Sequence, residues 1–166
     1  MTFTHRQLFF LAALASAGML AFALYLQEAL HLEPCPLCIF QRVFVMAIGA
    51  VAVVAAVHNP ATLGRRFYAG LMGLLAVGGG AVASRQVWLQ HLPADQVPEC
   101  GPGLDYMLES FPLKEALQLV LRGSGECAEV DWTLLGFSIA EWMLVVFSGF
   151  LIYALILFFT KTFATR

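Results

Sequence analysis

The sequence predicts an all-α membrane protein built as a four-helix transmembrane bundle with two extracytoplasmic loops. Composition is the first reason: 60% of the 166 residues are hydrophobic and 12% are charged, against roughly 25% charged residues in an average soluble domain. The second reason is that the chain contains four apolar runs of the length that an α-helix needs to cross a bilayer, about 20 residues. These runs are residues 8–27, 39–57, 67–92 and 142–160, and they contain only two charged residues, Arg42 and Arg85.

The first run also resembles the apolar part of a signal peptide, because Ala15, Ser16 and Ala17 could mimic a cleavage site. The apolar stretch continues to Gln27, however, so we expect it to be retained as the first span. Four spans leave no room for a separate soluble domain. We therefore expect one integral membrane domain over residues 1–166.

The distribution of charge predicts which loops lie outside. All 11 acidic residues fall in residues 28–33 or 95–141. Basic residues mark the remaining segments, and such segments are cytoplasmic by the positive-inside rule. We expect both termini to be cytoplasmic and the loops at residues 28–38 and 93–141 to be extracytoplasmic. The basic residues in question are Arg6, Arg65, Arg66, Lys161 and Arg166.

All four cysteines fall in these two outer loops. Cys35 and Cys38 form a C-x-x-C pair in the first loop, and Cys100 and Cys127 lie in the second. Outside the cytoplasm disulfides persist, and four cysteines permit three pairings. A tetrahedral zinc site is the alternative. It is disfavoured because the chain has a single C-x-x-C pair and the other two cysteines are far apart.

Local chemistry favours a redox role for the C-x-x-C pair over a structural one. A bridge between Cys35 and Cys38 closes a small ring, which gains little loop-closure entropy. Pro36 suits the first position of a helix. Cys38 would then lie in the first turn, where free backbone N–H groups and the helix dipole stabilise a thiolate.

Arg42 follows Cys38 by four residues and therefore lies on the same helical face. It could simply extend to the membrane surface, but an intramembrane charge is costly and is usually functional. A membrane quinone would be a fitting electron acceptor, because Arg42 could stabilise the charge that reduction places on its oxygens. The residues do not distinguish ubiquinone from menaquinone.

The chain resembles the disulfide bond formation protein B (DsbB) family of bacterial inner-membrane thiol oxidases over nearly its whole length. Three stretches carry the resemblance: Glu33-Pro34-Cys35-Pro36-Leu37-Cys38-Ile39-Phe40-Gln41-Arg42, Leu89-Gln90 with Pro93 before Cys100, and Gly125-Glu126-Cys127-Ala128-Glu129 followed by Trp132 and Leu135-Gly136.

This resemblance implies a function. A reduced periplasmic oxidase of the DsbA type would attack a Cys100–Cys127 disulfide at Cys100. Cys35 of a Cys35–Cys38 disulfide would then exchange with Cys100, and Cys38 would face the quinone beside Arg42. The chain would thus be a protein-thiol:quinone oxidoreductase that sustains disulfide bond formation.

One position departs from the family pattern. The family has a histidine near the outer end of the third span that is linked to the quinone, and the matching position here is Gln86, with His91 five residues further on. Both are candidate quinone-binding residues.

Two further features concern structure. Apolar residues recur at helical spacing between residues 113 and 121, which predicts a short amphipathic helix. It could lie on the membrane or pack on the bundle in contact with solvent. Gly78 to Gly80 predict a close approach of two helices.

Two other classes of protein remain open at this point. An enzyme of the vitamin K epoxide reductase type also combines a helical bundle with paired cysteines, but its C-x-x-C pair sits at a late span. A structural membrane protein with inert loop disulfides would need no electron acceptor.

Overall fold

The computed structural model describes residues 4–93, 95–99, 106, 110–130 and 132–160. It is dominated by four long helices, and all four are long and apolar enough to cross a membrane. The predicted four-helix membrane fold is therefore confirmed, and the chain is a multi-pass membrane protein. The helices are α1 (His5–Leu30), α2 (Pro36–His58), α3 (Thr62–Gln90) and α6 (Ile139–Phe159).

Capping residues determine where the helices begin and end. The bounds of the helices therefore differ by a few residues from the bounds of the apolar runs. Thr4 and Gln7 form a capping box at the start of α1, and Ser138 and Glu141 form one at the start of α6. Such a box satisfies backbone N–H groups that have no partner within the helix. Asn59 ends α2 in the left-handed conformation, with φ of 42°.

The bundle is held by successive helix pairs: α1 packs on α2, α2 on α3, and α3 on α6. Helices α3 and α6 approach closely at Gly79. The approach is so close that a Cβ atom at this position would clash with the ring of Phe147. A Cβ at Gly78 would likewise lie 2.7 Å from the ring of Phe44 on α2. The predicted close approach at these glycines is confirmed.

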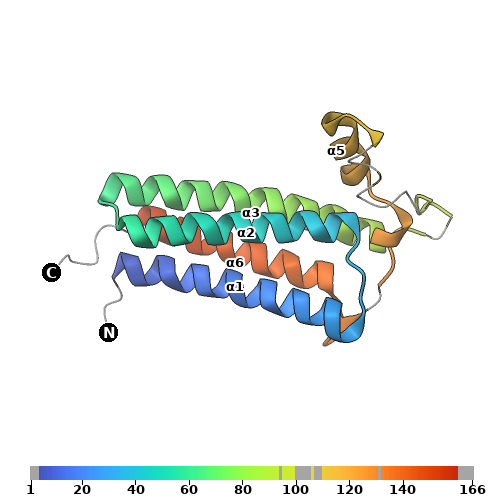
Figure 1. Cartoon of the computed structure of the whole chain (residues 1–166), viewed down its shortest axis with the longest axis horizontal. Helices are drawn as coiled ribbons and strands as arrows, with labels where there is room; N and C mark the ends of the chain where they lie inside the picture. The colour runs from blue at the N-terminus through green and yellow to red at the C-terminus, as the bar shows by residue number, and fades with distance from the viewer. Residues whose placement is uncertain (1–3, 94, 100–105, 107–109, 131, 161–166) are drawn as a thin grey trace.

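Both described ends of the chain lie at one end of the bundle (Figure 1). There the buried guanidinium of Arg65 on α3 contacts a ring nitrogen of His5 at 2.7 Å and donates to the carbonyl oxygen of Thr160 at 2.6 Å. Arg65 thereby ties the start of α1 to the end of α6.

The opposite end carries the α1–α2 connection and the long loop between α3 and α6 (Figure 1), and we call it the loop end. A short helix, α5, lies where the sequence predicts one, and its Val120 is buried against the bundle. The loop also contains a 3-10 turn and a two-stranded antiparallel hairpin that leads into α6. These elements are α5 (Leu113–Arg122), η1 (Gly125–Cys127), β1 (Thr133–Leu134) and β2 (Phe137–Ser138).

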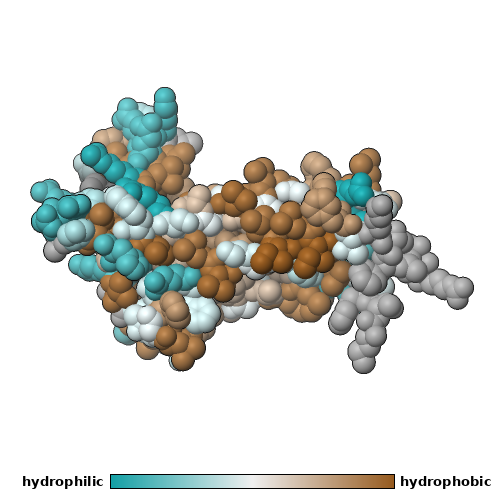
Figure 2. Space-filling view, turned by 180° about the vertical axis from the view of Figure 1, so that it is seen from behind, coloured by the Kyte–Doolittle hydropathy of each residue, from teal (hydrophilic) through white to brown (hydrophobic). Residues whose placement is uncertain are grey.

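The surface follows the division into apolar spans and a polar end. Figure 2 shows hydrophobic residues over the middle of the bundle and hydrophilic residues gathered at the loop end. Large apolar side chains point outward along the helices, among them Phe22, Leu74 and Ile152, each at least half exposed. Such an apolar belt is what a lipid-facing surface requires.

Candidate functional site

The C-x-x-C pair lies at the start of α2, at the loop end. Cys35 is the N-cap residue, and its sulfur accepts the backbone N–H of Cys38 at 3.4 Å. Pro36 occupies the first helical position, so the predicted helix start is confirmed. The two sulfur atoms lie 2.9 Å apart and both residues are free thiols in this structure. The Cys35–Cys38 disulfide stays a prediction.

A third thiol, Cys127, reaches the pair from the second loop. The turn η1 places Cys127 in one buried cluster with Cys35. The nearby Cys35 thiol and the backbone at Ser124 and Leu37 lower the pKa of Cys127 to about 6. The same proximity of Cys127 is the main reason why the pKa of Cys35 is raised. Of these two thiols, Cys127 therefore ionises first and Cys35 keeps its proton.

The fourth cysteine, Cys100, lies outside the described residues. Its predicted exchange with Cys35, and its predicted disulfide with Cys127, stay predictions. The neighbouring Glu99 is described, and its carbonyl oxygen accepts the backbone N–H of Gly125 at 3.3 Å. The chain just before Cys100 therefore runs beside η1, two residues from Cys127.

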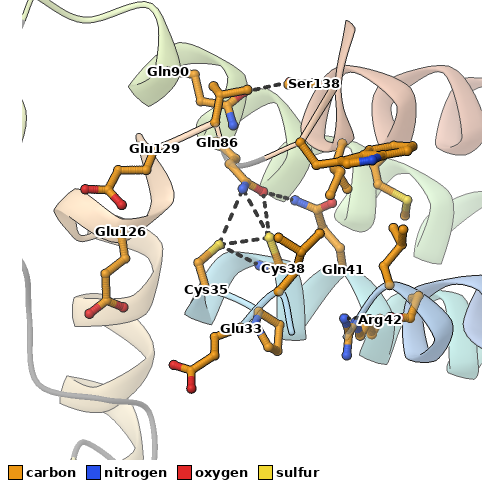
Figure 3. A pocket seen from close by; sticks show the side chains of 18 residues that line it. Glu33, Cys35, Cys38, Gln41, Arg42, Gln86, Gln90, Glu126, Glu129 and Ser138 are labelled. Atoms are coloured by element: carbon orange, nitrogen blue, oxygen red, sulfur yellow. Dashed lines mark hydrogen bonds between the residues drawn. The ribbon is translucent and has the colours of Figure 1, made fainter. Parts of the chain in front are cut away.

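Gln86 lies at the centre of the site. It is 3% exposed, and its side-chain nitrogen lies 3.1 Å from the sulfur of Cys38 and 3.4 Å from that of Cys35 (Figure 3). Its side-chain oxygen accepts a 2.6 Å hydrogen bond from the amide nitrogen of Gln41 on α2, which is also buried. One amide, from α3, thus contacts both sulfurs, and a second, from α2, is hydrogen-bonded to it.

Arg42 lines the same cavity, but its hydrogen bonds are directed toward α1. Its guanidinium donates to the side-chain oxygen of Gln27 at 2.7 Å and to the backbone carbonyl of Ala23 at 3.4 Å. The sequence predicts that Arg42 is a cation one turn below Cys38. In the structure Gln86 and the Cys35 thiol donate to the Cys38 sulfur, while Arg42 lines the cavity and donates to α1.

His91 is the C-cap residue of α3, and its ring nitrogen Nδ1 bonds the carbonyl oxygen of Val87 at 2.8 Å. It is exposed and does not line the cavity that Gln86 enters. Of the two candidates at the end of the third span, the structure brings Gln86 to the cysteines and leaves His91 at the helix end.

These side chains border a cavity of about 110 Å³, which we call the cysteine cavity. An engineered cavity of roughly 150 Å³ takes a benzene ring, so the cysteine cavity has the scale of a single six-membered ring. Its walls come from all four long helices and both loops. They include Ala23 and Leu26 of α1, Cys38, Gln41 and Arg42 of α2, Gln86 and Gln90 of α3, Met143 of α6, and Glu126, Glu129 and Trp132 of the second loop.

Sequence reasoning missed Gln41 and the two glutamates. A signal for Gln41 was present, because it is a polar residue inside an apolar run and lies one turn after Cys38. Glu126 and Glu129 flank Cys127 in the sequence, but no periodicity predicts that the loop folds back over α2. Figure 3 shows both glutamates on the loop segment next to the thiols, with their carboxylates turned away from the sulfurs.

A multi-pass helical bundle with three thiols gathered at one end defines the class: a membrane thiol oxidoreductase. Comparison with known proteins agrees. Residues 5–157 match the family model described as disulfide bond formation protein DsbB. The chain belongs to the DsbB family, and its role is in disulfide bond formation.

Three relatives illustrate the similarity, two of them named disulfide bond formation protein B. The protein from Hahella chejuensis is 56% identical over 147 residues, 89% of each chain. The protein from Chromobacterium violaceum is 53% identical over 152 residues, 92% of each chain. Disulfide bond formation protein B 1 of Pseudomonas aeruginosa is 47% identical over 156 residues, which is 94% of this chain and 96% of the relative.

Proposed function

We propose that the chain reoxidises a periplasmic thiol oxidase of the DsbA type and passes the electrons to a membrane quinone. The observation that carries this proposal is the cluster of Cys127, Cys35 and Cys38 beside one cavity. The cluster joins a polar loop, which a soluble partner can reach, to a cavity walled by membrane helices. This arrangement supports a path from a water-soluble dithiol to a lipid-soluble acceptor.

The same proposal includes the orientation in the bacterial inner membrane. Arg6, Arg65 and Arg66 belong to the end of the bundle that holds the described chain ends, while Glu33 and Glu126 belong to the loop end. Basic segments next to spans favour the cytoplasm. The termini are then cytoplasmic, and both cysteine loops face the oxidising periplasm.

The first half of the reaction moves electrons into the loop. A thiolate of the partner attacks Cys100, the Cys100–Cys127 bond breaks, and Cys127 leaves as a thiolate. The backbone at Ser124 and Leu37, which lowers the pKa of Cys127 whatever the state of Cys35, favours this departure, because thiols of low pKa are good leaving groups. The product is a disulfide between the partner and Cys100.

The second half moves the electrons to the pair on α2. Cys127 attacks Cys35, the Cys35–Cys38 bond breaks, and the electron pair stays on Cys38. The resemblance implies exchange between Cys35 and Cys100, but Cys127 is the described thiol that lies against Cys35. The second partner thiolate then frees Cys100, which attacks Cys127 and releases Cys35. One S–S bond replaces another throughout, leaving an oxidised partner and a Cys35–Cys38 dithiol.

The cysteine cavity suits a quinone head group by size and by its donors. Arg42 and Gln41 offer N–H groups to carbonyl oxygens, and Ala23, Leu26 and Met143 offer apolar walls. A bound quinone would supply the two-electron oxidant that restores the Cys35–Cys38 disulfide, taking up two protons to become the quinol. Cys38 lines the cavity together with Cys35, and the proposal takes Cys38 as the thiol that meets the quinone.

The test is to mix the purified full-length chain with a reduced DsbA-type partner and a short-chain quinone, and to follow quinone absorbance. We expect quinone consumption in step with partner oxidation. We also expect Cys38→Ser to abolish it. The proposal fails if no quinone is consumed, or if Cys38→Ser leaves the rate unchanged.

A visible spectrum gives an independent check. With Cys35→Ala, a Cys38 thiolate beside a bound quinone should produce a charge-transfer band. A colourless variant that still copurifies with quinone, as measured by mass spectrometry, would contradict this arrangement of Cys38 and the quinone.

A further inference from the structure

Gln86 and Gln41 are two buried amides in helices that are otherwise apolar. They are 3% and 2% exposed, respectively. A buried polar side chain is costly unless it is hydrogen-bonded, and such residues within membrane spans are usually functional. Both amides find their described partners in each other and in the cysteine pair.

The hydrogen bond between the two amides orients Gln86. An amide oxygen only accepts and an amide nitrogen only donates. Because Gln41 donates to the oxygen of Gln86 at 2.6 Å, the nitrogen of Gln86 is turned toward the two sulfurs (Figure 3). Gln41 therefore acts on the cysteines through Gln86.

The side-chain nitrogen of Gln86 lies closer to the sulfur of Cys38, at 3.1 Å, than to the sulfur of Cys35, at 3.4 Å. Cys38 also lies in the first turn of α2, at the positive end of the helix dipole. Hydrogen bonds to an ionised group are stronger than those to a neutral group. The hydrogen bond from Gln86 thus stabilises the Cys38 thiolate more than it stabilises Cys38 in a disulfide.

We infer that Gln86 is a catalytic residue that stabilises the Cys38 thiolate, and that Gln41 is a positioning residue that holds the Gln86 amide in its donating orientation. The inference rests on the proposed function in that Cys38 is there the leaving group when Cys127 attacks Cys35. Gln86 thereby has a different role from the quinone contact expected from the sequence, and Gln41 has a second role beside its N–H group in the cavity.

The first experiment measures the pH dependence of Cys38 alkylation by iodoacetamide in the reduced full-length chain with Cys35→Ala, read by peptide mass. We expect Gln86→Leu to raise the midpoint by about one pH unit, or tenfold in thiolate at fixed pH, since a hydrogen bond to a charged group is lost. We expect Gln86→Glu, which keeps the shape and removes the donor, to raise it at least as far. Gln41→Leu should raise the midpoint by a smaller amount, because the amide of Gln86 remains but is free to turn.

Gln90→Leu is the matched control. Gln90 also lines the cysteine cavity on α3, but its side-chain oxygen accepts from Ser138 at 2.8 Å, away from the sulfurs. We expect its midpoint to equal that of the parent. The inference is overturned if Gln86→Leu and Gln86→Glu leave the midpoint unchanged, or if Gln90→Leu shifts it equally.

A reduction potential supplies a second readout. With Cys100→Ser and Cys127→Ser, one disulfide remains, and Gln86→Glu should make its potential more negative. A tenfold change in the equilibrium constant corresponds to about 30 mV. An unchanged potential would contradict the inference. Neither measurement needs the quinone or the protein partner. Both can therefore be interpreted even if the proposed electron path is wrong.

Discussion

Cys127 of the second loop lies in one buried cluster with Cys35 at the N-cap of α2, and each thiol shifts the pKa of the other. The contact joins residues 92 positions apart and brings the loop onto the membrane bundle. In a thiol exchange the attacking and attacked sulfurs must meet, so this contact defines the step at which electrons would cross from one cysteine pair to the other.

A variant that retains only these two thiols should form a disulfide between the loops. With Cys38→Ser and Cys100→Ser, we expect Cys35 and Cys127 to pair under mild oxidation, as measured by the mass of the linked peptides. The matched variant Cys35→Ser with Cys100→Ser leaves Cys38 and Cys127, which should pair in clearly lower yield. Equal yields would show that the contact is not selective.

The pH dependence of the reduced loop thiol follows from its lowered pKa. A thiolate forms as pH rises through the pKa, so alkylation of Cys127 should increase with pH and level off above a midpoint near pH 6. Cys35 should react only at much higher pH, because its pKa is raised. Peptide mass spectrometry of the reduced chain separates the two sites.

The control for this prediction removes the Cys35 thiol from the neighbourhood of Cys127. Cys35→Ala should move the Cys127 midpoint upward, toward the ordinary value of 9.0. A midpoint that remains near 6 in this variant would mean that the backbone contacts alone stabilise the thiolate.

Arg42→Leu should weaken quinone binding while sparing exchange with the protein partner. Loss of a hydrogen bond from a charged donor costs about 1.5–3 kcal/mol, so we expect KM for quinone to rise about tenfold or more. Single-turnover oxidation of the partner should be unchanged. The control is Arg85→Leu: Arg85 stacks over Trp88 at 4.1 Å and is not part of the cavity wall. A matching rise in KM for Arg85→Leu would contradict a specific role.

Gly79→Ala should destabilise the bundle, because its Cβ would overlap the ring of Phe147 on α6. Overpacking costs about 1–3 kcal/mol, which corresponds to a Tm lowered by roughly 2–10 °C in a chain of this size. Gly149→Ala is the control, since a Cβ there meets nothing within 4 Å. Thermal unfolding in detergent compares the two, and equal Tm values would count against close packing at Gly79.

The sequence predicts the fold well because its signals are local. Each apolar run is long enough to span, and Pro36 predicts the start of α2 from its own backbone chemistry. The close approach at Gly79 was likewise visible, because small residues in a span favour tight helix pairs. Composition and spacing are sufficient for such features.

The site was less predictable because it depends on contacts between distant segments. Gln86 and Gln41 are 45 positions apart, and only packing of α2 on α3 turns their amides toward each other. Arg42 lies on the predicted face of α2. Its guanidinium nevertheless points toward α1, because it donates a hydrogen bond to Gln27. The residue pattern of one helix does not indicate where a neighbouring helix lies.

Two electron donors can be compared in the variant Cys127→Ala. On the proposed path the loop pair serves the protein partner, whereas the pair on α2 serves the quinone. A small dithiol such as dithiothreitol can reduce Cys35–Cys38 without the loop pair. We therefore predict that quinone reduction driven by the DsbA-type partner is lost in this variant, while reduction driven by dithiothreitol continues. Equal loss with both donors, or quinone reduction that continues with the partner, would rule out this division between the two cysteine pairs.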